Sequence, residues 1–407
     1  MNENKKSNSK TLWYILFAFV TVIMCYLFIV VYFYFISPYN ISLKLAFWPF
    51  VPEHKIGEMY LDATVDVSFS GRDIYTLEEV DKSIVGVNVR ENGFIVTPYD
   101  EIKACEDISQ IKIKTNDGSV YDGKLLFADV DFNLAILKCE VVGEGGDEIH
   151  IPFVNVIDVS NVIYEGAEVI AVSSPIHEKN IWDGKIDTPD VSDVFKTIEV
   201  SNTLAVDFVI ENCYSVQLVE SGTEFSGGAV FDKAGNILGL SYKEKLDDGS
   251  HVIMPLDGVN LFLNQVISSY EKQETYKNDL VDAFVGFDQI ELDCFQYVSR
   301  LNSNESAQKT FYFDNSFPGY SDDIIRFESS ELPSYFLFKD FVWKEQIVLG
   351  KNEVVSALKI GGRTYKIETK VDLLEILYKA NKNEKMTIYY YDVDQIGTNL
   401  LSISFTI

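Results

Sequence analysis

Between about residues 83 and 255 the chain consists of short apolar runs separated by polar turns, and this alternation restricts it to β-rich folds. The runs are only a few residues long, as in "GFIVT", "IKIKT" and "NILGLSY", and the turns carry Gly, Asn and Asp, as in "NDGS" and "DKAGN". Short apolar runs bounded by turn-forming residues are typical of antiparallel strands. The pattern therefore predicts an antiparallel all-β barrel or sandwich.

Two stretches with helical spacing follow this β-rich region. The first, "MPLDGVNLFLNQVISSYEKQ", comes directly after its last strand, and the second is "TKVDLLEILYKANKNE". Apolar residues recur in both at the intervals of an amphipathic helix. Strand-like runs such as "TFYFD" and "LLSISFTI" surround the second helix. We therefore predict a β-rich domain over 81–272 and a smaller α+β domain over 281–407.

The N-terminal region contains a run of 26 residues, Thr11 to Ile36, without a formal charge. A helix of this length, at about 1.5 Å per residue, exceeds the ~30 Å of a bilayer core. Three lysines lie in residues 1–10, and no Lys or Arg follows the run until Lys44, so the positive-inside rule predicts a cytoplasmic N-terminus. We expect a single-pass anchor over 11–36 in the cell membrane, with the main domains outside. A cleaved signal peptide is the alternative, but the run is too long and no small-residue cleavage site follows.

The stretch 37–80, between the expected anchor and the β-rich domain, has no firm periodicity. It contains "SPYN" and "FWPFVPEHK", and such turn and breaker residues interrupt regular structure. We expect a juxtamembrane connector with irregular structure here.

The charge and the cysteines exclude several kinds of site. The chain has 34 Lys and Arg against 62 Asp and Glu, a net charge of −28, and such an acidic surface repels nucleic-acid phosphates. The five cysteines are odd in number and contain no CxxC pair, so neither a disulfide framework nor a zinc site is predicted. We expect no metal, no cofactor and no nucleic-acid partner.

Five blocks of sequence are more informative together than any one of them. They are, in order, "NGFIVTPYDEI", "IKIKTNDGSVYDGKLLFADVDFNLAILK", "EGAEVIAVSSP", "FSGGAVFDKAGNILGL" and "SHVIMPLDGVNLFLNQVI". In this order they resemble the HtrA/Deg family of trypsin-like serine peptidases. The resemblance implies a trypsin-like double β-barrel after the anchor, a C-terminal PDZ-like domain and a role in protein quality control at the bacterial envelope. Family members often form trimers, so a homotrimer is one implied assembly state.

The resemblance assigns catalytic roles to four positions, and three of them carry residues unlike those of a working site. Ser226, followed by two glycines, stands at the nucleophile position. Asp100 replaces the histidine base in "FIVTPYDEI", and a carboxylate with a pKa near 4 is a weak base at neutral pH. Asn133 replaces the aspartate that orients the base. Glu224 replaces a glycine of the oxyanion hole, where a negative charge is adverse.

These replacements predict a pseudoprotease, in which Ser226 is retained for the turn that it forms and not for chemistry. No spacing argument makes any histidine a substitute base, and we expect structural or surface roles for all four, at His54, His150, His177 and His251. An active serine endopeptidase with a non-standard base, such as Asp100 or His177, is the alternative. A third reading is a β-rich adhesion or envelope protein with a coincidental Ser-Gly-Gly, against which the five ordered blocks argue.

The C-terminal domain resembles a PDZ domain, which binds a peptide as an added strand and holds its terminal carboxylate with backbone N–H groups. Val285, Gly286 and Phe287 in "AFVGFDQIEL" match the carboxylate-binding loop, and "VDLLEILYKA" matches the helix that lines the groove. The implied partners are exported or misfolded polypeptides, or a membrane or envelope protein. The segment 295–345 is longer and more aromatic than the family pattern, so a domain that only packs on the barrel is the alternative.

Overall fold

The computed structural model describes the N-terminal helices, most of two β-barrels and the core of a C-terminal domain. Statements below refer to the residues that it describes, which are 3–35, 39–47, 51–73, 76–99, 102, 104–129, 132–140, 150–156, 162–176, 180–189, 191, 195–201, 204–209, 213–219, 225, 228–246, 248–256, 260–274, 276–277, 279–281, 309–311, 325–327, 335–337, 341–349, 353–366, 370–392 and 400–407.

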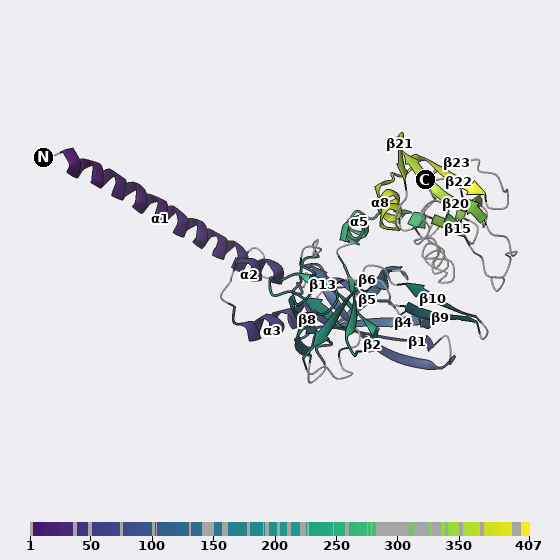
Figure 1. The fold of residues 1–407 in the computed structure, drawn as a ribbon, viewed down its shortest axis with the longest axis horizontal. Helices are drawn as coiled ribbons and strands as arrows, with labels where there is room; N and C mark the ends of the chain where they lie inside the picture. Colours follow the sequence, from purple (N-terminus) through teal and green to yellow (C-terminus); the bar gives the residue numbers. More distant parts are fainter. Residues whose placement is uncertain are drawn as a thin grey trace.

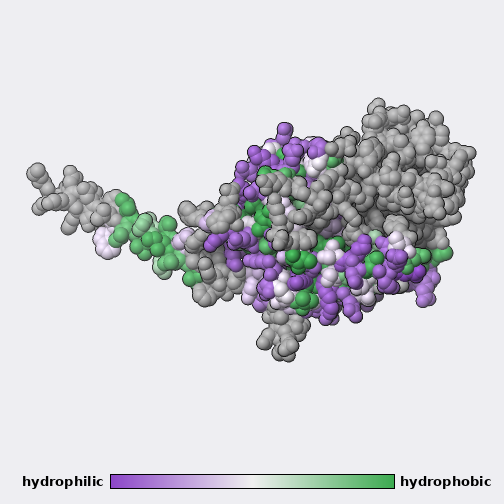
Figure 2. Space-filling view, turned by 90° about the horizontal axis from the view of Figure 1, so that it is seen from below, coloured by the Kyte–Doolittle hydropathy of each residue, from purple (hydrophilic) through white to green (hydrophobic). Residues whose placement is uncertain are grey.

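The chain begins with a 33-residue helix, α1 (Glu3–Phe35), which extends away from the other elements (Figure 1). Its large apolar side chains are exposed wherever they are described, from Trp13 to Val31, and Figure 2 shows them as a hydrophobic surface along the helix. Within the part of the chain that the structure describes, no helix meets the combined length and hydropathy required to cross a membrane.

The stretch 37–80 is more regular than its sequence predicts. It contributes two helices, α2 (Ile41–Phe47) and α3 (Glu53–Ala63), and a strand, β1 (Thr64–Asp73). Pro52 is the residue that immediately precedes α3. Proline is compatible with the start of a helix, so this breaker residue marks the start of a short helix and does not prevent it.

The first barrel is closed by six antiparallel strands in the order β1-β2-β3-β6-β5-β4. The strands other than β1 are β2 (Glu79–Arg90), β3 (Phe94–Pro98), β4 (Cys105–Lys114), β5 (Val120–Asp129) and β6 (Leu134–Cys139). Val65, Val67 and Phe69 of β1 point into its interior, where they pack with Ile95 and Leu137. Because β1 closes this barrel, the β-rich domain begins earlier in the chain than residue 81.

The second barrel is also closed by six strands, in the order β11-β14-β13-β12-β7-β8. Its strands are β7 (Glu168–Val172), β8 (Ile181–Ile186), β11 (Tyr214–Leu218), β12 (Ala229–Phe231), β13 (Ile237–Lys245) and β14 (His251–Pro255). A separate hairpin of β9 (Phe195–Ser201) and β10 (Leu204–Val209) lies between β8 and β11 in sequence. The predicted all-β barrel architecture is thus confirmed, as two barrels.

Helix α5 (Asn260–Glu271) follows the second barrel and packs on the first. Phe262 contacts Phe127 and Phe132 at ring-centroid distances of 5.5 and 5.6 Å, and Tyr270 meets Phe94 edge to face at 5.7 Å. Aromatic pairs in this distance range add to the stabilisation from burial. The predicted helix after the last strand therefore closes the domain against its first barrel.

We call Tyr39, Asn40, α2 and α3 together the N-terminal strap, because they bind across the β12–β13 turn. The Ser42 hydroxyl donates a 2.5 Å hydrogen bond to the main-chain oxygen of Gly235. Gly235 has a φ of +102°, and a Cβ there would lie 2.7 Å from the Cα of Ser42, so the contact requires glycine. From α3, Tyr60 stacks on Phe231 at 4.3 Å and donates to the main-chain oxygen of Asp232.

The C-terminal domain contains an antiparallel sheet in the order β17-β20-β22-β23, with β21 paired to β20. These strands are β17 (Tyr335–Leu337), β20 (Glu353–Ile360), β21 (Arg363–Lys366), β22 (Lys385–Asp392) and β23 (Leu401–Thr406). Two hairpins, β15 (Lys309–Phe311) with β16 (Ile325–Phe327) and β18 (Phe341–Trp343) with β19 (Gln346–Leu349), lie before β20 in sequence. The predicted late helix is present as α8 (Lys370–Lys379), with Leu373, Leu374 and Leu377 fully buried.

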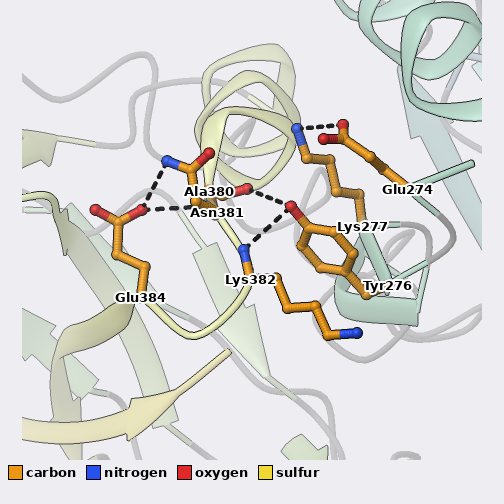
Figure 3. Close-up of polar contacts among 7 residues, drawn as sticks. All are labelled: Glu274, Tyr276, Lys277, Ala380, Asn381, Lys382 and Glu384. Carbon is orange, nitrogen blue, oxygen red and sulfur yellow. Dashed lines mark hydrogen bonds and ion pairs between the residues drawn. The ribbon is translucent and has the colours of Figure 1, made fainter. Parts of the chain in front are cut away.

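Helix α8 contacts α5, and a tyrosine after α5 joins the two domains (Figure 3). The Tyr276 hydroxyl donates to the main-chain oxygen of Ala380 and accepts a hydrogen bond from the main-chain N–H of Lys382, at 3.3 and 3.1 Å. Beside it, Lys277 pairs with Glu274 at 2.9 Å. These contacts attach the turn after α8 directly to the segment that follows the double-barrel domain.

Candidate active site

Asn133, at the expected position of the orienting acid, lies at the end of the hairpin between β5 and β6. It is 5% exposed and has a φ of +42°, a left-handed conformation that Asn adopts more readily than most residues. Its side-chain oxygen and its main-chain oxygen both accept from the main-chain N–H of Tyr99, at 3.0 and 3.1 Å. Because Tyr99 precedes Asp100 in sequence, Asn133 is placed beside the position expected for the base.

The family resemblance expects an orienting acid at residue 133, and the chemistry of the residue there differs. A carboxylate there would stabilise a neighbouring imidazolium by charge. The carboxamide of Asn133 is neutral, and its oxygen already accepts the main-chain N–H of Tyr99. The side chain at residue 133 therefore carries no charge with which to stabilise an imidazolium.

Asp129 is a buried acidic residue close in sequence to Asn133, and it was not identified from the sequence. It ends β5, is 1% exposed, and accepts from the main-chain N–H of Phe132 at 3.2 Å. Burial, and after it the negative charge of Asp129, raises the pKa of Tyr99. The phenol of Tyr99 therefore stays protonated at neutral pH. The only sequence signal for Asp129 is its place at the end of an apolar strand, which does not distinguish it from an ordinary turn residue.

Phe225, next to the nucleophile position, is anchored in the interior of the second barrel. It is fully buried, and its ring meets Trp182 of β8 at 5.6 Å and His251 of β14 at 4.9 Å, in both cases close to edge to face. Its main-chain oxygen accepts from the N–H of Gly228 at 3.2 Å. A Cβ at Gly228 would lie 2.4 Å from the Phe225 ring. Close packing against the Phe225 ring therefore explains why residue 228 is a glycine.

The two barrels are also joined by a buried aspartate, Asp66 of β1. It is 4% exposed, and one of its oxygens accepts from the hydroxyls of Ser174 at 2.8 Å and Ser83 at 2.6 Å. Ser174 follows β7 of the second barrel, so its hydrogen bond crosses between barrels. Hydrogen bonds to a charged acceptor are stronger than neutral ones, and Asp66 thus fixes the segment after β7 to the first barrel.

Several residues expected at the site lie outside the residues that the structure describes. These are the nucleophile Ser226, the base-position Asp100, the oxyanion-position Glu224, the histidine His177, and the peptide-binding residues Val285, Gly286 and Phe287. Their roles stay predictions. Asn133 is the one predicted catalytic position whose surroundings the structure describes.

The two histidines with described side chains have packing or surface roles. His251 is 1% exposed and packs against the Phe225 ring, which makes it a core residue of the second barrel. His150 stacks on Tyr39 at 5.2 Å and lies 3.3 Å from the Glu91 carboxylate. His54 lies in α3, and its side chain is outside the described residues. Among the side chains that the structure describes, no group of three or more potential metal ligands occurs.

Comparison with known protein families agrees with the architecture. Residues 85–240 match the family model of the trypsin-like peptidase domain. The matched range begins in β2 and ends in β13, so it includes strands of both barrels. No curated protein matches the chain significantly. The matched range and the two closed barrels of six strands lead to the same conclusion, that this part of the chain is a peptidase-type domain with the trypsin fold.

Proposed function

We propose that the chain is a membrane-anchored, HtrA-like pseudoprotease that binds polypeptides without cleaving them. The observation that carries this proposal is the environment of Asn133. The family resemblance expects the orienting acid at residue 133, and the neutral carboxamide there accepts from the main-chain N–H of Tyr99, just before Asp100. A serine hydroxyl needs a base to take its proton and an acid to orient that base. With Asp100 and Asn133 at these positions, Ser226 is not activated.

Binding is assigned to the C-terminal domain, which we propose to be PDZ-like. Support comes from helix α8 and an antiparallel sheet that includes β20, β22 and β23, which follow one another in the order that the family pattern has for its groove helix and the strands around it. A PDZ domain recognises a free terminal carboxylate. Polypeptides with exposed C-termini are therefore the proposed ligands, with Val285, Gly286 and Phe287 as the carboxylate-binding loop.

The anchor is proposed to be the uncharged run 11–36, which extends on both sides of the α1 side chains that the structure describes. Its support is the exposure of the apolar side chains of α1, which have no protein core to cover them. The full chain should resist extraction from membranes by alkaline carbonate and dissolve only in detergent. Release of the intact chain by carbonate alone would contradict the anchor.

Labelling with a fluorophosphonate serine probe tests the pseudoprotease directly. We expect no labelling of the full chain, and labelling of Ser226 after the combined changes Asp100→His, Asn133→Asp and Glu224→Gly, because these replace the three altered groups. Ser226→Ala in the repaired variant is the control. Robust labelling of the unmodified chain that is lost in Ser226→Ala would establish instead an active endopeptidase with a non-standard base.

Peptide binding has its own test. Fluorescent peptides with a free C-terminal carboxylate should bind the full chain, and the same peptides with an amidated C-terminus should bind at least tenfold more weakly, since about 1.4 kcal/mol of carboxylate recognition is lost. Equal affinity for the two forms would contradict a PDZ-like binding mode.

A further inference from the structure

The end of α1 and the first contact with the trypsin-type domain are separated by only three residues. Helix α1 ends at Phe35, and Tyr39 already accepts a hydrogen bond from the main-chain N–H of Phe153 at 2.9 Å. Four residue steps of fully extended chain cover at most about 14 Å. The domain is therefore held within this distance of the end of α1.

The strap that follows is bound too firmly to act as a longer tether. Ile41 donates its main-chain N–H to the oxygen of Phe153 at 2.9 Å, and Ile41 and Leu45 are buried. The Ser42 hydroxyl both donates to the Gly235 oxygen and accepts from the N–H of Asn155, at 2.5 and 2.8 Å. Releasing the strap would expose these apolar side chains and break each of these hydrogen bonds, so the short link fixes the distance.

From this geometry we infer that the α2 side of the trypsin-type domain rests on the bilayer surface. The inference depends on the proposed anchor. If the apolar run ends at Ile36, the chain leaves the hydrocarbon core there, and the headgroup layer beyond the core is only about 5–8 Å thick. A reach of at most about 14 Å from Phe35 to Tyr39 then keeps the start of the strap at or just beyond the headgroups. The partner surface is the phospholipid headgroup layer on the side where α1 emerges.

Charge distinguishes this contact from ordinary electrostatic recruitment. The chain carries a net charge of −28, so its attraction to anionic lipids cannot hold it at a membrane. The contact is imposed by the covalent link, and it should be insensitive to salt and to the fraction of anionic lipid. The polypeptides bound by the domain are then those that lie close to the membrane surface.

The test uses the full chain in lipid nanodiscs, with a bimane fluorophore on one engineered cysteine and nitroxide-headgroup lipid as quencher. Ala46→Cys places the probe on an exposed position of α2. Glu78→Cys is the matched control, because it lies beyond β1, a ten-residue strand that spans about 33 Å away from α3 and points away from α1 (Figure 1). Cys25 and Cys294 are changed to Ser in every variant, since the other three cysteines are buried.

We expect nitroxide lipid to reduce the fluorescence at residue 46 roughly twofold, because α2 follows directly on the short link that holds this side of the domain at the headgroups, and to leave residue 78 unchanged. A Gly/Ser spacer of about 20 residues between Ser37 and Pro38, with a mean length of about 25 Å, should relieve the quenching. Unquenched fluorescence at residue 46 in chains that co-purify with discs overturns the inference and leaves the anchor intact. Quenching that persists with the spacer also overturns it, because the surface would then bind lipid by itself. Failure to co-purify with discs refutes the anchor, and this inference with it.

Discussion

Substitutions of Tyr60 test whether the N-terminal strap contributes to the stability of the trypsin-type domain or is only attached to it. Tyr60 is fully buried, stacks on Phe231 at 4.3 Å, and donates a 2.5 Å hydrogen bond to the main-chain oxygen of Asp232. Truncating a buried aromatic residue costs about 3–5 kcal/mol, whereas Tyr60→Phe removes only the hydrogen bond and costs about 1–2 kcal/mol. For a domain of this size the expected decreases in Tm are about 6–20 °C for Tyr60→Ala and about 2–8 °C for Tyr60→Phe.

The assay is thermal unfolding of the full chain in detergent, followed by near-ultraviolet circular dichroism. Tyr164→Ala is the control, because this tyrosine is 60% exposed and its truncation should change the free energy of unfolding by less than about 0.5 kcal/mol. If Tyr60→Ala unfolds at the same temperature as Tyr164→Ala, the strap contributes nothing to the stability of the domain and the reasoning fails.

The same residue predicts a dependence on alkaline pH. Burial, and after it the charge of Asp232, raises the pKa of Tyr60 above its ordinary value. A tyrosine whose pKa is higher in the folded than in the unfolded state stabilises the fold in full at pH values below its unfolded pKa of about 10. This stabilisation is lost as the pH rises from there towards the folded-state pKa. The free energy of unfolding of the unmodified chain should therefore fall more steeply above pH 10 than that of Tyr60→Phe. Parallel profiles would show that the phenol is not buried as described.

Three further predictions concern the barrels. Phe225→Ala should lower the free energy of unfolding by about 3–5 kcal/mol, because the Phe225 ring is fully buried between Trp182 and His251; urea unfolding with no loss of stability would contradict this packing. A fragment that begins at residue 81 lacks β1 and should be insoluble, whereas one that begins at residue 39 should give dispersed NMR spectra; two equally folded fragments would show that β1 is dispensable. Burial raises the pKa of Cys139 to about 12, so iodoacetamide at pH 8 should leave it unmodified in the native chain and alkylate it in urea; rapid native alkylation, read by mass spectrometry of tryptic peptides, would refute its burial.

Sequence alone was sufficient for the β-rich architecture, and it named candidate site residues whose roles stay predictions. Short apolar runs separated by Gly, Asn and Asp turns predict antiparallel strands from local sequence. The alternation of apolar and polar residues along "IKIKT" predicts that one face of that strand points into the core. The same local logic identified α5 and α8, whose apolar faces recur at helical intervals. The identity of the residue at position 133 was also readable, because it depends on the order of motifs and not on packing.

Tertiary structure alone decided where the domain begins and which side chains surround the site. The apolar residues Val65, Val67 and Phe69 alternate as expected for a barrel strand. The breaker residues before them made this segment look irregular in the sequence. Only the closed barrel shows that a sixth strand is needed there. The contacts of Asp66 with Ser174 and of Phe225 with Trp182 join residues far apart in sequence. Such pairs are set by the way two barrels and their connecting segments pack, and packing depends on all the partners at once, so no local pattern contains it.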